Sequence, residues 1–319
     1  MEFLQHTLEE PVSIAGIGLH SGRQVVMVLR PAPANSGIRF IRTDLPGRPA
    51  ITASYANVSD TRLATTLSQN GASVATVEHL LAAVMQSGVD NLTVEIDGPE
   101  VPIMDGSAAP FLRLLDKRRK KAQSACRRAI RILRPVEYRQ GDAWVTVSPH
   151  DGLKVTCEID FADQVIRRQK LTVSCSSRSF SRDIAKARTF GFFEDIERLR
   201  KNGLALGGSL ENAVVVNRFG VMNEGGLRFA DEFVRHKILD LIGDLSLLGA
   251  PLLGRVVASK SGHGHHLGFM QTLMADSSAW EYVQHGHGHS ARERCAVQPL
   301  DAVFPCLFPP PVAGKPAAL

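Results

Sequence analysis

A short apolar segment, residues 235–244, carries three polar side chains at intervals of four residues, His236, Asp240 and Asp244. On an α-helix these positions fall within an arc of about 80° and therefore point in one direction. The residues between them are mostly Ile and Leu, which favour burial of the helix, and buried carboxylates need a partner. A divalent metal ion is one such partner, because an imidazole and a carboxylate one turn apart can bind the same ion. A helix whose polar face lies in water fits the same spacing, so the rest of the chain must decide.

The length and composition place the chain among ordinary globular proteins. Its 319 residues suffice for two domains, and 44% hydrophobic with 22% charged residues exclude a disordered or fibrous protein. The net charge of +5 suits an anionic small molecule, or transient contact with an anionic surface. Nucleic-acid binding is not expected, because the positive charge forms no stripes and only 6% of the residues are aromatic.

The cysteines and the hydropathy pattern indicate the compartment. Five widely spaced cysteines without a C-x-x-C pair argue against a disulfide framework and favour a reducing environment. The N-terminus lacks a basic stretch followed by an apolar one, so no signal peptide is expected. The most apolar long window, residues 239–258, contains Asp240, Asp244 and Arg255, whose charges are costly in a bilayer. We therefore expect a cytoplasmic protein without stable membrane insertion.

The order of the expected elements indicates two similar halves. Each half begins with short strands and continues with amphipathic helices, which is typical of a duplicated α+β unit. In the first half we expect a helix over residues 73–86, and in the second half helices over 182–188 and 267–280.

A basic run, Lys117–Lys121, separates the two halves. We expect a first domain over residues 1–124, a second over 125–290, and an unstructured tail over 291–319. The basic run is most simply a solvated connector; the alternative is a patch for an anionic lipid or substrate.

Histidines and acidic residues in otherwise apolar sequence combine into a hydrolytic metal site. A catalytic zinc needs three protein ligands and a carboxylate near the attacking water. His79, His236 and Asp240 would bind the ion, and Glu78 would be the general base. As an isolated feature, Glu78-His79 fits a helix-surface pair equally well.

A proton donor is expected opposite this base. His263 follows an apolar strand, and Asp244 would orient its imidazole or keep it charged. The alternative for His263 is a loop histidine bonded to the backbone.

Two histidine-rich tracts compete with this interpretation, His263–His266 and His285–His289. Glycine-rich histidine tracts can collect metal ions without catalytic geometry. A metal-storage or metal-binding module is therefore the non-enzymatic alternative, and it predicts several loosely bound ions.

Five segments together carry a resemblance to a known family. They are Thr76–Leu80, Val101–Phe111, Ala187–Phe192, His236–Asp244 and Lys260–His263. In order and at compatible spacing, they resemble the UDP-3-O-acyl-N-acetylglucosamine deacetylases, zinc enzymes of the committed step in lipid A synthesis of Gram-negative bacteria. The match runs from about residue 3 to residue 285.

The resemblance implies two similar α+β domains, each a sheet with helices, packed so that the helices lie between two outer sheets. It implies the roles given above for the ligands, for Glu78 as base and for His263 as acid with Asp244 as its partner. Thr189 would help to hold the developing oxyanion, and Lys237 would help to bind the substrate and the charged intermediate.

The resemblance also implies a substrate site for an acylated UDP-amino sugar. Phe190 and the segment from Ile196 to Gly208 would form an apolar passage for the acyl chain. Asp160-Phe161 and Lys260 would lie near the uridine and diphosphate.

The expected cofactor is Zn²⁺, with Fe²⁺ as the alternative in the cell, and the expected state is a monomer. Another zinc amidohydrolase, acting on a peptide or small amide, would keep the ligands without needing the acyl passage. The stretch Gly264–His266, the basic run Lys117–Lys121 and the chain from about His285 onward have no place in the family pattern.

Overall fold

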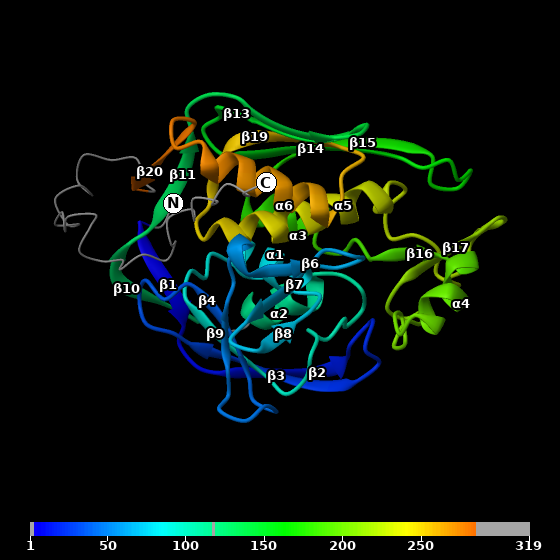
Figure 1. Cartoon of the computed structure of the whole chain (residues 1–319), viewed down its shortest axis with the longest axis horizontal. Helices are drawn as coiled ribbons and strands as arrows, with labels where there is room; N and C mark the ends of the chain where they lie inside the picture. Colours follow the sequence, from blue (N-terminus) through cyan, green and yellow to red (C-terminus); the bar gives the residue numbers. More distant parts are fainter. Residues whose placement is uncertain (1–2, 117–118, 285–319) are drawn as a thin grey trace, which may run out of the picture.

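The computed structural model describes residues 3–116 and 119–284. Two β-sheets form the outer layers, and the main helices lie between them (Figure 1). The first sheet and its helices come from the N-terminal half of the chain, the second sheet and its helices from the C-terminal half. The predicted α+β layout of two similar halves is therefore confirmed.

The first outer sheet has the order β2-β3-β9-β4-β5. Its strands form because apolar residues alternate with polar ones; in the central strand, Leu92, Val94 and Ile96 are buried, whereas Glu95 pairs with arginines on the outer face. The strand bounds are β2 (Val12–Ile17), β3 (Gln24–Pro31), β4 (Ile38–Arg42), β5 (Ala50–Thr52) and β9 (Leu92–Ile96).

Two helices cover the inner side of this half, α1 (Glu78–Ser87) and α2 (Ala109–Asp116). α1 ends at Gly88, whose φ of 78° is the left-handed conformation that glycine adopts freely. It begins later than expected, because the first residues of the predicted helix belong to β8. A small sheet precedes it, with η1 (Tyr55–Asn57), β6 (Val58–Asp60), β7 (Thr66–Gln69) and β8 (Ala72–Val74).

The second outer sheet is built around β19, which pairs in parallel with β11 and β14 and antiparallel with β13. β12 and β15 extend it through hairpins, and β20 pairs with β11. The bounds are β11 (Arg128–Ile132), β12 (Val136–Gln140), β13 (Ala143–Ser148), β14 (Leu153–Asp160), β15 (Arg168–Ser174), β19 (Leu252–Ser259) and β20 (Trp280–Gln284).

The helices of the second half face α1 across the middle of the molecule. α5 (Glu232–Leu245) packs between α1 and β14, and almost all of its side chains are buried. The other helices are α3 (Ser177–Asp183), η2 (Ser246–Leu248) and α6 (His263–Ala275).

Two expected helix ranges in this half are wrong. The helix expected at 182–188 is α3, which starts earlier because Ser176 and Ser179 form a capping box. The helix expected at 267–280 is α6, which starts directly after Gly262. Its glycines resemble a loop in the sequence, but Gly268 lets the ring of Tyr138 pack against the helix backbone.

An insert projects from the side of the molecule (Figure 1). Parallel pairing of β16 with β17 holds it together, and a short hairpin and a helix complete it. Its elements are β16 (Phe190–Phe192), α4 (Phe193–Lys201), β17 (Val214–Asn217) and β18 (Gly220–Val221).

A two-stranded sheet connects the N-terminus with the middle of the chain, β1 (Leu4–Leu8) and β10 (Lys120–Cys126). Part of the basic run thus lies in β10, which crosses the proposed domain boundary near residue 124; that boundary stays a prediction. The tail over 291–319 and the His285–His289 tract lie outside the described residues. None of the helices described is long and apolar enough to cross a membrane.

Candidate active site

The site forms where α1 meets α5. The two helices approach closely at Gly243, since a side chain there would collide with the backbone of Glu78. The N-terminal turn of α1 thereby brings Glu78 and His79 against the polar face of α5. The Ile and Leu side chains on the remaining faces of α5 are buried as well.

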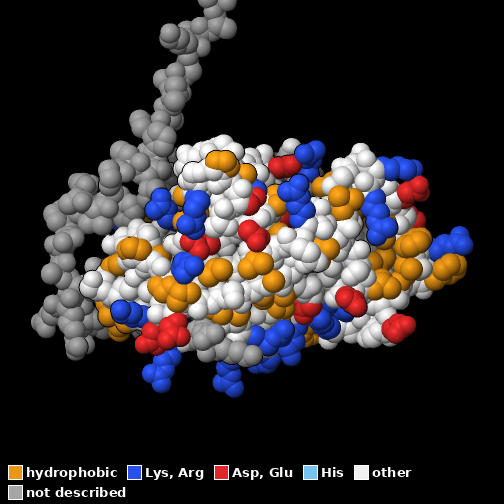
Figure 2. All heavy atoms as spheres, turned by 90° about the horizontal axis from the view of Figure 1, so that it is seen from below, with side chains coloured by type: hydrophobic (Ala, Val, Ile, Leu, Met, Phe, Trp, Pro, Cys, Tyr) orange, Lys and Arg blue, Asp and Glu red, His pale blue; other side chains and the backbone are white. Residues whose placement is uncertain are grey.

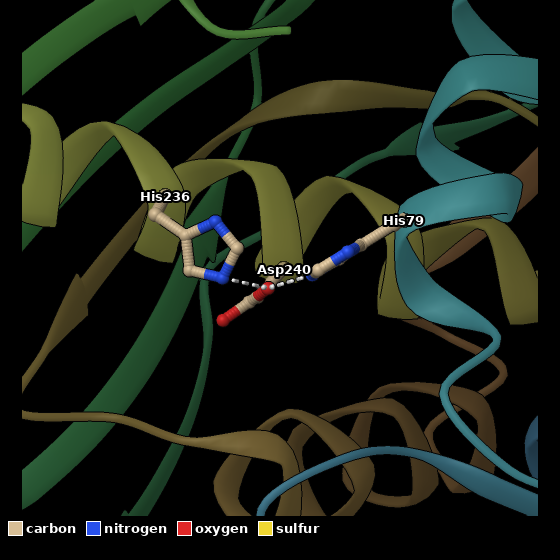
Figure 3. Close-up of side chains that lie close together, drawn as sticks. All are labelled: His79, His236 and Asp240. Atoms are coloured by element: carbon tan, nitrogen blue, oxygen red, sulfur yellow. Dashed lines mark ion pairs between the residues drawn. The ribbon is translucent and has the colours of Figure 1, made fainter. Parts of the chain in front are cut away.

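His79, His236 and Asp240 form a compact group (Figure 3). The Oδ1 atom of Asp240 lies 3.5 Å from Nε2 of His79 and 3.2 Å from Nε2 of His236. The two imidazole rings meet edge to face, with centroids 5.0 Å apart. All three side chains are buried, so bulk solvent does not surround them.

This group fits a metal ion. Asp240 Oδ1 is buried and has no hydrogen-bond partner among the described residues, which a metal would supply. The Nδ1 atom of His236 lies 3.1 Å from the carbonyl oxygen of Ala187, a bond that leaves Nε2 free as a ligand. Burial lowers the pKa of His236 to about 3, so the imidazole is neutral, as metal binding requires.

The charge state of Asp240 agrees with this role. Burial alone would raise its pKa, but His236 and Lys237 outweigh burial and hold the pKa well below its ordinary value. The ammonium of Lys237 lies 2.8 Å from Oδ2, which leaves Oδ1 for the group with the histidines. Two imidazole nitrogens and one carboxylate oxygen are a donor set that zinc and iron both accept.

Glu78 lies beside this group and is almost fully buried. Burial raises the pKa of its carboxyl, which makes the carboxylate a better proton acceptor near neutral pH. Its Oε2 accepts a hydrogen bond from the backbone N–H of Thr65 at 3.1 Å. Its Oε1 lies 3.9 Å from Nε2 of His263, so the expected base and acid face each other.

His263 is held in place by Asp244. Its Nδ1 donates to Oδ2 of the carboxylate at 2.7 Å. Burial alone would lower the pKa of His263, but the ion pair outweighs burial and raises it to about 9, while the pKa of Asp244 is lowered. His263 is therefore protonated at neutral pH and has a proton to give.

Sequence reasoning missed two residues of the site, Thr65 and His266. The hydroxyl of Thr65 donates to Oδ1 of Asp244 at 2.6 Å, and Nδ1 of His266 lies 2.7 Å from Oδ2 of the same carboxylate. Nothing in the local sequence around Thr65 signals this contact. In the sequence, His266 stands out only as part of a histidine-rich tract.

A third unexpected residue is His20, which is close enough to His263 to be affected by its charge. Burial lowers the pKa of His20, Glu100 opposes this, and the charge of His263 lowers it further. Its Nε2 atom has no hydrogen-bond partner among the described residues.

The aromatic residues that the sequence predicts for substrate binding lie next to the group of His79, His236 and Asp240. The ring centroid of Phe190 lies 6.2 Å from that of His236 and 5.8 Å from that of Phe161. The ammonium of Lys237 lies 5.7 Å from the same Phe190 centroid. Thr189 precedes Phe190, and its backbone is fixed by hydrogen bonds to Gly106 and Val214. The structure therefore brings these residues together.

Lys260 and Asp160 lie further out and bind each other. The ammonium is 3.0 Å from Oδ2 of Asp160 and 3.1 Å from Oδ2 of Asp142. Both carboxylates hold the pKa of Lys260 above its ordinary value. A phosphate would have to compete with these carboxylates for the ammonium.

The insert contains a groove of about 910 Å³. Its lining is apolar, basic and acidic, and includes Phe193, Ile196, Phe219, Arg200, Arg218, Glu194 and Glu197. Figure 2 shows hydrophobic side chains gathered at this end of the molecule, with basic side chains beside them. Gly208 does not line the groove; it lies against Ala205 and Leu19.

The comparisons with known proteins agree with one another. The family model described as LpxC, UDP-3-O-acyl N-acetylglycosamine deacetylase, matches residues 5–275. A UDP-3-O-acyl-N-acetylglucosamine deacetylase of Methylococcus capsulatus is 50% identical over 281 residues, 88% of this chain and 92% of the relative. The protein of the same name from Syntrophotalea carbinolica is 46% identical over 303 residues, 94% of this chain and 98% of the relative. The chain belongs to the UDP-3-O-acyl N-acetylglycosamine deacetylase family.

Proposed function

We propose that this chain is a zinc-dependent hydrolase that removes the N-acetyl group from UDP-3-O-acyl-N-acetylglucosamine. The observation that carries the proposal is the convergence of His79, His236 and Asp240 beside two groups suited to proton transfer, Glu78 and His263. The names of the relatives supply the substrate, and acetate and a free amino sugar are the products.

His79, His236 and Asp240 would hold the zinc ion. When bound, zinc supplies a Lewis acid that polarises the amide carbonyl and acidifies a water molecule. The second imidazole nitrogen of His236 donates to Ala187, which fixes the ring orientation that such a ligand needs. Iron in place of zinc in the cell is compatible with the same donor set.

Glu78 and His263 divide the proton transfers. Glu78 takes a proton from the attacking water, because its raised pKa makes it a suitable base. His263 gives a proton to the departing amine nitrogen, because its ion pair with Asp244 keeps it protonated at neutral pH. Without that proton the amine would be a poor leaving group.

Thr189 and Lys237 would stabilise the charge that develops on the carbonyl oxygen. Hydrogen bonds on both sides hold the backbone of Thr189, so the main chain from which its hydroxyl extends is fixed before the reaction begins. Lys237 brings a positive charge beside the metal group. Among the carboxylates of the described residues, its ammonium forms an ion pair only with Asp240.

The remaining residues would bind the substrate. Phe190 and Ile196 would contact the acyl chain, where each buried methylene contributes about 0.8 kcal/mol. Phe161 and Asp160 would lie near the uridine, and Lys260 near the diphosphate, where an ammonium acts as a point charge. A cytoplasmic location and a monomeric state complete the proposal.

The direct test is acetate release from the acylated UDP sugar, compared with the same sugar lacking the acyl chain. We expect the acylated substrate to react much faster, because the insert binds the acyl chain. Equal rates on both would favour a less selective amidohydrolase. No acetate from either substrate with metal present would contradict the proposal.

A further inference from the structure

Asp244 accepts hydrogen bonds from three side chains. His263 and His266 each place Nδ1 at 2.7 Å from Oδ2, and the hydroxyl of Thr65 lies 2.6 Å from Oδ1. Asp244 is therefore the centre of a buried network in which two imidazoles share one oxygen atom.

The position of His266 is fixed by the start of α6. His263 and His266 are three residues apart in the first turn, so both rings face α5 from the same side of the helix. Nε2 of His266 lies 3.1 Å from the hydroxyl oxygen of Ser261. The side chain of His266 is 1% exposed, so both of its nitrogens are satisfied by the protein.

The network determines which nitrogens carry protons. Asp244 is ionised, because burial alone would raise its pKa but the two histidines lower it. Both Nδ1 atoms must then donate to it, and Nε2 of His266 accepts from Ser261. Burial lowers the pKa of His266, Asp244 opposes this, and the charge of His263 lowers it again. One imidazole is thus charged and the other neutral.

We propose that His266 is a positioning residue for the proton donor: its N–H fixes the carboxylate of Asp244 and limits how tightly His263 holds its proton. The inference rests on the proposed function, in which His263 is the acid. A carboxylate with an additional donor has less negative charge available for its ion pair, so it stabilises the charged imidazole less. His263 is then a stronger acid than it would be beside Asp244 alone.

Other titratable groups surround the pair and stay the same when His266 is changed. Asp240 on α5, Glu78 on α1 and His20 lie close enough to His263 to interact with its charge, and Asp240 also acts on His266. Tyr55 of η1 and Tyr138 of β12 lie on the other elements packed against α6. A difference in kcat or in its pH dependence between variants at position 266 therefore reports the hydrogen bond to Asp244.

The test compares His266→Asn with His266→Leu. The Asn amide can donate from nearly the same place as Nδ1, whereas Leu has a similar size and no donor. On its alkaline side, the plot of kcat against pH falls where His263 loses its proton; we call this fall the alkaline limb. In the Leu variant we expect this limb to move up by about one pH unit. We also expect kcat to fall about tenfold, with KM nearly unchanged. The Asn variant should stay within about threefold of the parent, with an unshifted limb.

His265→Asn is the matched control, because His265 is the neighbouring histidine and bonds only the N-terminus of α6 in the described contacts. It should leave kcat and the limb unchanged. An unshifted limb in His266→Leu, or a shift of the same size in His266→Asn, would overturn the proposal. Two metal ions per chain, one of them lost in His266→Leu, would overturn it as well, because the cluster would then be a metal site.

A measurement on the unsubstituted protein covers the case in which the Leu variant does not fold. The ring nitrogens of His266 should report a neutral Nδ1–H form at neutral pH, because burial lowers the pKa of this imidazole. A charged His266 at neutral pH would contradict the proposal. Failure of the proposed function is distinguishable, since it would show as normal turnover in His263→Ala, whatever the result at His266.

Discussion

The backbone of Glu78 occupies the space where a side chain on Gly243 would lie. This contact sets the distance between α1 and α5, and therefore between the histidine of one half and the ligands of the other. Because interiors are closely packed, there is no slack to absorb even one methyl group at this crossing.

Replacing Gly243 with alanine should therefore separate the two helices. We expect a loss of about 1–3 kcal/mol in the free energy of unfolding and a marked loss of bound metal. Metal analysis and thermal unfolding measure both effects. Gly152→Ala is the control, since a side chain there would meet no atom within 4 Å. Normal metal content in Gly243→Ala would contradict this view of the crossing.

Glu78→Gln separates the base from the ligands. The amide keeps the size of the carboxylate but cannot accept a proton, so kcat should fall by about 100- to 10,000-fold. Metal content should remain at the parent level, because the ligand group does not include Glu78. A metal-free variant, or one with normal turnover, would remove Glu78 from the role of base.

The pH dependence of stability should reveal the charged form of His263. In the metal-free protein its pKa is raised from 6.5 to about 9, so its ion pair stabilises the fold fully below about pH 6.5. That contribution is lost as the pH rises through about 9. The difference in unfolding free energy between the parent and His263→Ala should shrink over this interval. A constant difference would show that His263 is not charged.

The buried pair Arg188–Glu232 anchors the start of α5. Glu232 is fully buried and accepts from the side chain and the backbone of Arg188, the residue before Thr189. Glu232→Ala leaves a buried guanidinium without its partner, which should cost about 3–5 kcal/mol in unfolding free energy. Denaturant unfolding measures this. The exposed pair Arg198–Asp195 is the comparison, and Asp195→Ala should cost less than about 1 kcal/mol.

Periodicity in the sequence predicted much of the site. The four-residue spacing of His236, Asp240 and Asp244 specified one helix face, and the structure places all three on the buried side of α5. His79 lies against this face, and Glu78 and His263 lie beside it, so the candidate site contains the residues that the sequence nominated; their roles stay predictions. The shared face could be predicted because helical geometry alone determines which residues lie on one side of a helix.

Contacts across the fold could not be predicted in this way. Thr65 and Asp244 are 179 residues apart, and their hydrogen bond depends on how a loop of the first half packs on α5. His266 joins the network only because α6 starts at His263, at a glycine-rich stretch that the sequence assigned to a loop. The pairing of β10 with β1 likewise depends on long-range register.

Metal content of the parent protein and of His79→Ala tests the central claim most directly. The account predicts one tightly bound ion per chain in the parent, and its loss together with acetate release in His79→Ala, because the ion needs ligands from both α1 and α5. A His79→Ala protein that is folded and still holds one ion with parental affinity would contradict it.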